Sequence, residues 1–159
     1  MPRGKAPGVR DLTPDPIYGN TLVTKLINRS MRDGKKSVAA TQVYGALKLI
    51  EEKTGKDPIA VFIQALEAIK PTMEVRARRI GGAAYQVPTP VRGRRQESLG
   101  IRWLVESARS RSNSEFHTFA EKMAAEILDA TNGEGLSIKK KQDIEKVAEA
   151  NKAFAHFKW

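Results

Sequence analysis

The chain has 159 residues, of which 40% are hydrophobic and 29% are charged, and its formal net charge is +10. This length favours a single domain with a core large enough to fold alone. The lack of cysteine excludes disulfides and thiolate metal sites, and the lack of a long apolar run predicts a soluble intracellular protein without a membrane span.

Residues 1–19 are predicted to form a flexible basic arm. Prolines and glycines recur throughout this stretch and prevent a regular element. Arg3, Lys5 and Arg10 lie among them. A frayed tail is the alternative interpretation, but the positive charge matches that of later basic segments and favours an arm that becomes ordered on nucleic acid.

Three helices are predicted between residues 20 and 70. The first begins near Asn20, has an apolar side and a basic side, and ends at Asp33-Gly34. The second follows directly and ends at Gly55. The third begins with a strong start signal, in which Asp57 is the N-cap and Pro58 occupies the first helical position.

A β-hairpin is predicted at about residues 72–89. Alternating residues lead to the turn Gly81-Gly82 and alternation then resumes. Neighbouring residues of a strand point to opposite faces. We therefore expect one set of side chains to face the core, and the next set to face away. The first set is Met73, Val75 and Ala77, and the second is Glu74, Arg76 and Arg78.

Three more helices are predicted after the hairpin. The fourth follows the basic run at residues 92–95. Ser112 or Ser114 is the expected cap of the fifth, which includes Phe116 and ends before Asn132. The sixth begins near Ser137 and extends through Phe154 towards the end of the chain.

The predicted fold is therefore mainly α: a single domain of about six helices with one protruding β-hairpin between the third and fourth helices. Residues 1–19 form the arm and residues 20–159 form the helical domain. An isolated two-stranded hairpin is only marginally stable in water, so a protruding one usually needs a partner.

Positive charge is confined to two segments of the chain. Basic residues outnumber acidic ones by eight to three in residues 1–40 and by ten to three in residues 70–111, whereas the remaining segments are close to neutral. A solvated surface has no reason to segregate charge in this way, but a phosphate backbone rewards a concentrated basic patch through counterion release. The pattern predicts nucleic-acid binding.

Signatures of enzyme chemistry are lacking. Gly34-Lys35-Lys36-Ser37 resembles the end of a P-loop, but Arg29 stands where that motif needs glycine. His117 and His156 have no second ligand at metal-binding spacing. We expect no catalytic activity, no cofactor and no bound metal.

Several strings of the sequence resemble one family closely. They are Arg78–Pro88, Arg102-Trp103-Leu104, Asp15–Tyr18, Gly34–Ser37 and Ala148–Trp159. These strings look like the bacterial form of the seventh protein of the small ribosomal subunit, and the resemblance covers essentially the whole chain. Gln42 departs from the family, which usually has an apolar residue there, and indicates a local change of packing.

The resemblance implies a structural ribosomal protein in the cytoplasm, with residues 20–159 as an rRNA-binding domain. Members of the family are primary binders of 16S rRNA that attach to the 3′ major domain and nucleate assembly of the head. Their hairpin lies near the E-site tRNA and the mRNA exit path, and they contact small-subunit proteins nine and eleven. No membrane or small-molecule partner is implied. Some members repress translation of their own operon.

The candidate site residues combine this resemblance with the charge pattern. Arginines can clamp phosphates through bidentate hydrogen bonds, whereas lysines act more as point charges. The residues predicted to contact rRNA are Arg3, Lys5, Arg10, Lys25, Arg29, Arg32, Lys35, Lys36, Arg76, Arg78, Arg92, Arg94, Arg95 and Arg102. The residues predicted at a hairpin tip near tRNA or mRNA are Arg79, Gly81, Gly82 and Tyr85, where Tyr85 either stacks on a base or packs under the hairpin.

Two other classes of protein remain as alternatives. A helical DNA-binding regulator with a winged hairpin would dock a recognition helix in the major groove and would usually be a two-fold dimer. No coiled-coil seam is present, and the charge spans an arm, a helix and a ribbon. An RNA-modifying enzyme is the other class, but it lacks any candidate catalytic constellation.

Overall fold

The computed structural model describes residue 4 and residues 11–157. Six α-helices, one 3-10 helix and a two-stranded antiparallel sheet make up the regular structure of these residues. The elements are α1 (Thr21–Ser30), α2 (Lys36–Thr54), α3 (Pro58–Ile69), β1 (Met73–Ile80), β2 (Ala83–Pro90), α4 (Arg94–Ser110), α5 (Phe119–Thr131), α6 (Leu136–Ala150) and η1 (Lys152–Phe157). The predicted mainly α fold with one hairpin between the third and fourth helices is confirmed.

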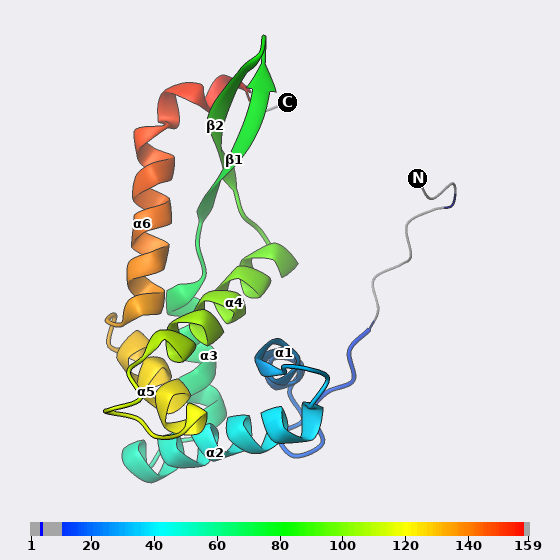
Figure 1. The fold of residues 1–159 in the computed structure, drawn as a ribbon, viewed down its shortest axis with the longest axis vertical. Coiled ribbons are helices and arrows are strands. Elements are labelled where there is room, and N and C mark those ends of the chain that lie inside the picture. Colours follow the sequence, from blue (N-terminus) through cyan, green and yellow to red (C-terminus); the bar gives the residue numbers. More distant parts are fainter. Residues whose placement is uncertain (1–3, 5–10, 158–159) are drawn as a thin grey trace.

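The first five helices enclose the main core. Its fully buried members include Leu26 of α1, Leu47 of α2, Phe62 of α3 and Leu104 of α4. Figure 1 shows these helices as a compact body, from which the hairpin and α6 extend side by side in the same direction. The hairpin therefore protrudes, as predicted, with α6 as its neighbour.

Side-chain caps fix the starts of α1 and α3. The side chain of Asn20 accepts a hydrogen bond from the amide of Leu22, and that of Asp57 accepts one from Ile59. Asp57 was predicted as a cap from the sequence, and the first helix was predicted to begin near Asn20. Helix α1 ends earlier than expected, at Ser30, because Met31 already has extended backbone angles.

The predicted start of the fifth helix is wrong. Helix α5 begins at Phe119, so Phe116 lies outside it, and neither Ser112 nor Ser114 is the cap. Thr118 and Glu121 form a reciprocal capping box instead, which satisfies two of the first amides of the helix. Gln42 of α2 accepts a further hydrogen bond from the amide of Ala120 at 3.0 Å, which explains a polar residue at that position.

The predicted faces of the hairpin are wrong at two positions. Glu74, expected to face away, is buried, and Ala77, expected in the core, is exposed. The antiparallel register pairs Arg76 with the fully buried Val87, and residues paired in this way share a face. Glu74 lies on this same face. The first strand alone was a poor guide because both faces are covered near the base of the hairpin, where residues 87–89 of β2 are all buried.

The sixth predicted helix is two elements. Helix α6 ends at Ala150, and Phe154 belongs to the 3-10 helix η1. Figure 1 shows that η1 turns back from the end of α6 towards the strands. This bend brings the C-terminal aromatic residues against the hairpin.

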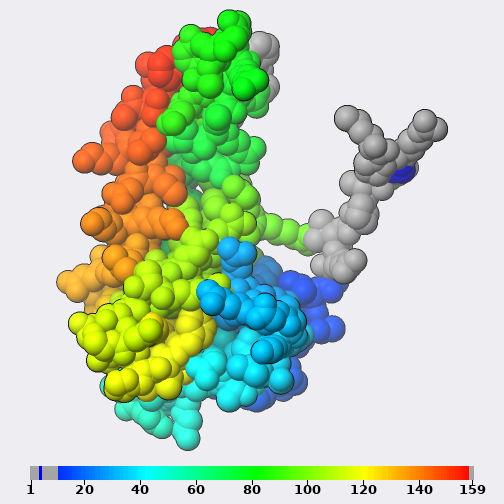
Figure 2. Space-filling view, viewed as in Figure 1, coloured from blue at the N-terminus to red at the C-terminus, as the bar shows by residue number. Residues whose placement is uncertain are grey.

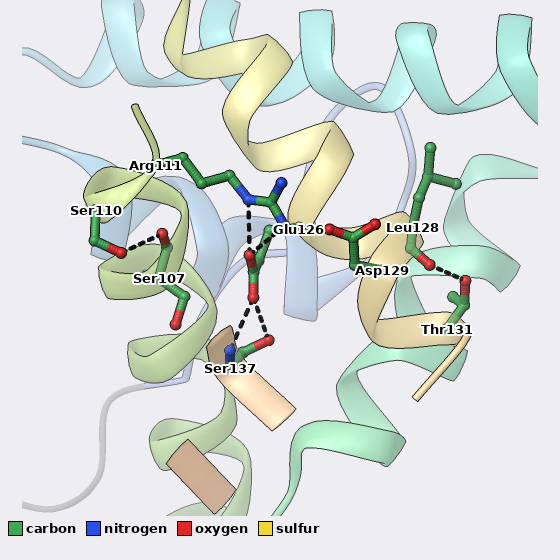
Figure 3. A network of polar contacts seen from close by, with 8 residues as sticks. All are labelled: Ser107, Ser110, Arg111, Glu126, Leu128, Asp129, Thr131 and Ser137. Carbon is green, nitrogen blue, oxygen red and sulfur yellow. Dashed lines mark hydrogen bonds and ion pairs between the residues drawn. The ribbon is translucent and has the colours of Figure 1, made fainter. Parts of the chain in front are cut away.

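A buried carboxylate fixes the start of α6 (Figure 3). Glu126 of α5 is fully buried and accepts hydrogen bonds from the amide and hydroxyl of Ser137, at 2.8 and 2.7 Å. Its other oxygen accepts a hydrogen bond from Arg111 Nε at 2.8 Å, and Arg111 also pairs with Asp129. Gly135 precedes α6 with φ 92°, and a Cβ there would lie 3.0 Å from Glu126 Oε1. The turn therefore requires glycine.

Further contacts hold α6 along its length. Lys140 pairs with Glu106 of α4, and Lys141 donates a hydrogen bond to the carbonyl of Ala68 at the end of α3. Farther along, Glu145 accepts hydrogen bonds from the amide and hydroxyl of Thr72, immediately before β1. These hydrogen bonds hold the pKa of Glu145 low against the opposing effect of burial. Helix α6 thus joins the helical body to the base of the hairpin.

We predict that Glu126→Gln lowers the free energy of unfolding by about 3 kcal/mol, because it breaks a buried ion pair without removing volume. Urea unfolding followed by circular dichroism measures the change. Glu67→Gln is the matched control, since the side chain of Glu67 is 62% exposed in its pair with Lys70, and the change should leave stability almost unchanged. Equal midpoints for the two variants would contradict the role assigned to Glu126.

Candidate nucleic-acid interface

Two helices present basic side chains to a shared groove. Lys25 and Arg29 of α1 line it together with Arg94 of α4. Lys25 Nζ lies 2.5 Å from the carboxylate of Glu97, and Arg29 Nη2 lies 3.4 Å from that of Glu106. The two acidic residues come from α4, so they hold the basic side chains of α1 across the boundary between the helices.

Glu106 joins three helices through its carboxylate. It accepts from Arg29 of α1 and from Lys140 of α6, the latter at 2.5 Å. The hydrogen bond from Lys140 lowers the pKa of Glu106, although burial opposes this effect. Glu106 is therefore ionised at neutral pH and keeps both cations in place.

A second basic groove lies around the turn between α1 and α2. Arg32 and Lys35 line it from this turn, Arg109 from the end of α4 and Lys122 from α5. Arg109 Nη2 donates a hydrogen bond to the carbonyl of Ser30 at 2.9 Å. Burial and the nearby charges of Arg32 and Arg29 lower the pKa of Arg109. The groove thus concentrates positive charge, which an anionic ligand would relieve.

The base of the hairpin contains a third basic group. Glu74 of β1 is buried between two arginines, Arg76 on the same strand and Arg95 on α4. Each arginine bonds to a different oxygen of the carboxylate, with Arg76 Nε at 2.7 Å and Arg95 Nη2 at 2.9 Å. Burial raises the pKa of Glu74, but the hydrogen bonds from both arginines outweigh it and the pKa is lowered.

The far end of the hairpin is open. Arg79, Gly81 and Gly82 are exposed, and both glycines have positive φ, 56° and 90°. Positive φ at both central residues of a two-residue turn is the geometry that the Gly-Gly pair predicts. The bare backbone can approach a flat or phosphate-lined surface closely.

Tyr85 packs beneath this tip. Its ring centroid lies 5.3 Å from that of Phe154 and 5.4 Å from that of Phe157, both of η1. Such separations are typical of favourable aromatic pairs. In Figure 2 the hairpin and the C-terminal segment accordingly form one continuous projection from the helical body. The ring packing that the sequence left open as an alternative is thus present.

The structure brings together some of the residues predicted to contact rRNA and leaves others apart. Three groups are brought together: Lys25, Arg29 and Arg94; Arg32 and Lys35; Arg76 and Arg95. Arg78 lies opposite Tyr85 on the hairpin, Arg92 precedes α4, Lys36 begins α2, and Arg102 is half-buried. Arg3, Lys5 and Arg10 lie outside the described residues. RNA contact by all of them stays a prediction.

Part of the arm expected at residues 1–19 is placed against α2. Asp15 is buried and accepts hydrogen bonds from the amides of Ile17 and Tyr18 and from the hydroxyl of Tyr44 at 2.6 Å. The bond to Asp15 raises the pKa of Tyr44 to about 12. The basic arm as a whole stays a prediction.

Sequence reasoning missed Arg109 and the role of Glu74. Arg95, Arg102 and Arg109 recur every seven residues along α4, and this spacing places them on one side of a helix. That spacing was a usable signal for Arg109. Glu74 had no such signal, because its two partners are brought together only by the packing of the hairpin against α4.

The described residues hold no group of three or more acidic or histidine side chains arranged to bind a metal ion. Within the same part of the chain, every helix is too short or too polar to cross a membrane.

The chain matches the family model described as ribosomal protein S7p/S5e over residues 2–152. It is 53% identical to the small ribosomal subunit protein uS7 of Rhodopseudomonas palustris over 159 residues, with 100% of both chains covered. The proteins of the same name from Carboxydothermus hydrogenoformans and Campylobacter jejuni are 55% and 56% identical, again with 100% of both chains covered.

We predict that Phe154→Ala loosens the hairpin without unfolding the helical body. Removing one ring of the aromatic cluster should raise the hydrogen-exchange rates of the amides in β2 by roughly tenfold, because a hairpin without a partner is marginal. Hydrogen–deuterium exchange measures this. Val147→Ala, at an exposed site on α6, should change neither region. Faster exchange throughout α2 and α3 would instead indicate global destabilisation.

Proposed function

Because the chain belongs to the ribosomal protein S7p/S5e family, we propose that it binds 16S rRNA in the 3′ major domain and nucleates assembly of the small-subunit head. Family membership makes the chain a structural component of the small ribosomal subunit, associated with ribosomal RNA and active in translation. It is not an enzyme, in agreement with the sequence analysis.

The observation that carries this proposal is that basic residues predicted to contact RNA come together from elements far apart in the sequence. Arg29 and Arg94 come from helices far apart in sequence and line one groove, while Arg76 and Arg95 meet at the hairpin base. A-form RNA closes its deep groove to side chains, so a binder of folded RNA reads backbone and shape. Cations spread over rigid elements suit that task because they match phosphates at fixed separations.

We extend the proposal to the hairpin tip. An exposed arginine, Arg79, lies two residues before Gly81 and Gly82, whose bare backbone forms the turn of the hairpin. The hairpin belongs to the projection seen in Figure 2. This arrangement supports a contact with E-site tRNA or with mRNA at the exit path. Contacts with small-subunit proteins nine and eleven belong to the same proposal and rest on the family resemblance.

Filter binding of the purified chain to a 3′-major-domain fragment of 16S rRNA tests the central proposal. We expect affinity at least about a hundredfold above that for unrelated structured RNA or duplex DNA, with a steep decline as salt increases. Equal affinity for all three would reduce the chain to a non-specific basic domain. Preference for duplex DNA would favour the winged-hairpin regulator.

A shortened hairpin tests the tip separately. Replacing residues 79–84 by Asn-Gly closes the turn directly on the pair Arg78 and Tyr85 and preserves the register of the remaining strands. We expect rRNA affinity to stay within about twofold of the wild type, because the basic groups at the base are retained. Reconstituted subunits should retain E-site tRNA less well. Loss of rRNA binding would contradict this division between base and tip.

A further inference from the structure

We propose that Glu74 is a positioning residue for RNA binding, which holds Arg76 and Arg95 in the orientation that contacts phosphate. A negative charge would then strengthen the binding of a polyanion. This inference rests on the proposed binding of rRNA and adds a specific role for one acidic side chain within the basic surface.

Glu74 of β1 lies between an arginine of its own strand and an arginine of α4. Its side chain is 9% exposed, whereas those of Arg76 and Arg95 are 57% and 48% exposed. Arg76 approaches one carboxylate oxygen through Nε and Nη2, at 2.7 and 2.5 Å. Arg95 approaches the other through Nε and Nη2, at 3.2 and 2.9 Å. Each guanidinium thus turns one edge to the carboxylate and keeps further N–H donors for a ligand.

These contacts fix the two arginines with respect to each other. Arg76 belongs to the hairpin and Arg95 to the first turn of α4, so the shared carboxylate also sets the distance between a strand and a helix. A free arginine side chain loses considerable rotamer freedom when it is immobilised on a ligand. Glu74 imposes much of this ordering before RNA arrives, which reduces the entropic cost of binding.

An explanation based on net charge alone predicts the opposite change in affinity. Without positioning, removal of an acidic residue beside two arginines raises the local positive potential and should tighten the binding of RNA. The sign of the change in affinity therefore separates the two explanations.

The test compares Glu74→Gln with Glu52→Gln in the salt-series filter-binding assay. Both variants replace a carboxylate by its amide and change the net charge equally. Glu52 is exposed on α2, away from the basic groups, and no ion pair of its side chain is found within the described residues. We expect Glu74→Gln to weaken rRNA binding by roughly tenfold, and Glu52→Gln to leave it unchanged.

A double-variant cycle links the effect to the two arginines. In an Arg76→Ala, Arg95→Ala background, Glu74→Gln should have no further effect on affinity, because there is nothing left to position. A tenfold loss that persists in this background would overturn the proposal and point to general damage to the fold. Circular dichroism of each variant at the assay temperature identifies such damage directly.

A measurement without RNA keeps this inference separate from the proposed function. ¹⁵N relaxation of the Nε–H groups should show Arg76 and Arg95 ordered in the wild type and mobile in Glu74→Gln. If both stay mobile in the wild type, or if Glu74→Gln binds rRNA as tightly as the wild type or more tightly, the positioning role is wrong. If the wild type itself fails to prefer the rRNA fragment, the proposed function fails, and the relaxation result still decides whether Glu74 orders the arginines.

Discussion

The support of the hairpin, one part of the candidate interface, depends on the buried carboxylate of Glu126. Helix α6 has Gly135 at its N-cap position, which provides no side chain to accept from the first amides. Glu126 supplies the missing acceptor from α5, and Arg111 ties the end of α4 to the same carboxylate. Since α6 continues into η1, which packs against β2, the direction set at this point places one of the supports of the hairpin (Figures 1 and 3).

Acidic residues shape the basic surface instead of merely diluting it. Glu97, Glu106 and Glu74 each contact a basic side chain from another element. Glu106 and Glu74 each hold two basic side chains at once. Hydrogen bonds from cations lower the pKa of Glu106 and of Glu74 against the effect of burial, so both stay ionised at neutral pH. Long basic side chains are costly to order. Carboxylates that order these side chains in advance lower the net positive charge, but they fix the positions of the cations. Fixed positions favour selective over non-specific binding of a polyanion.

Local signals in the sequence were sufficient for most of the fold. They failed where several neighbouring signals competed or where a contact came from elsewhere in the chain. Asp57-Pro58 and Gly81-Gly82 are short signals with a direct steric or hydrogen-bonding cause, and both elements form as predicted. The cap of α5 was misplaced because several serines competed with Thr118 in the same polar stretch. Among the basic residues, the seven-residue spacing along α4 contained a signal for Arg109 that the prediction did not use. This spacing carried no information on Glu74, whose partners meet only in the folded chain.

Different contacts hold the two ends of the hairpin. Glu74 and Arg76 share one face near the base of the hairpin, and the ion pair of Glu74 with Arg95 fixes this base to α4. Farther out, Tyr85 on the same face is fixed to η1 by aromatic contacts. Arg79 lies one residue beyond the pair formed by Arg78 and Tyr85, and its side chain belongs to the opposite face. Separate contacts hold the base and support the tip, so a change at the turn need not disturb the arginines at the base. This separation is the physical reason for proposing different ligands for the two ends.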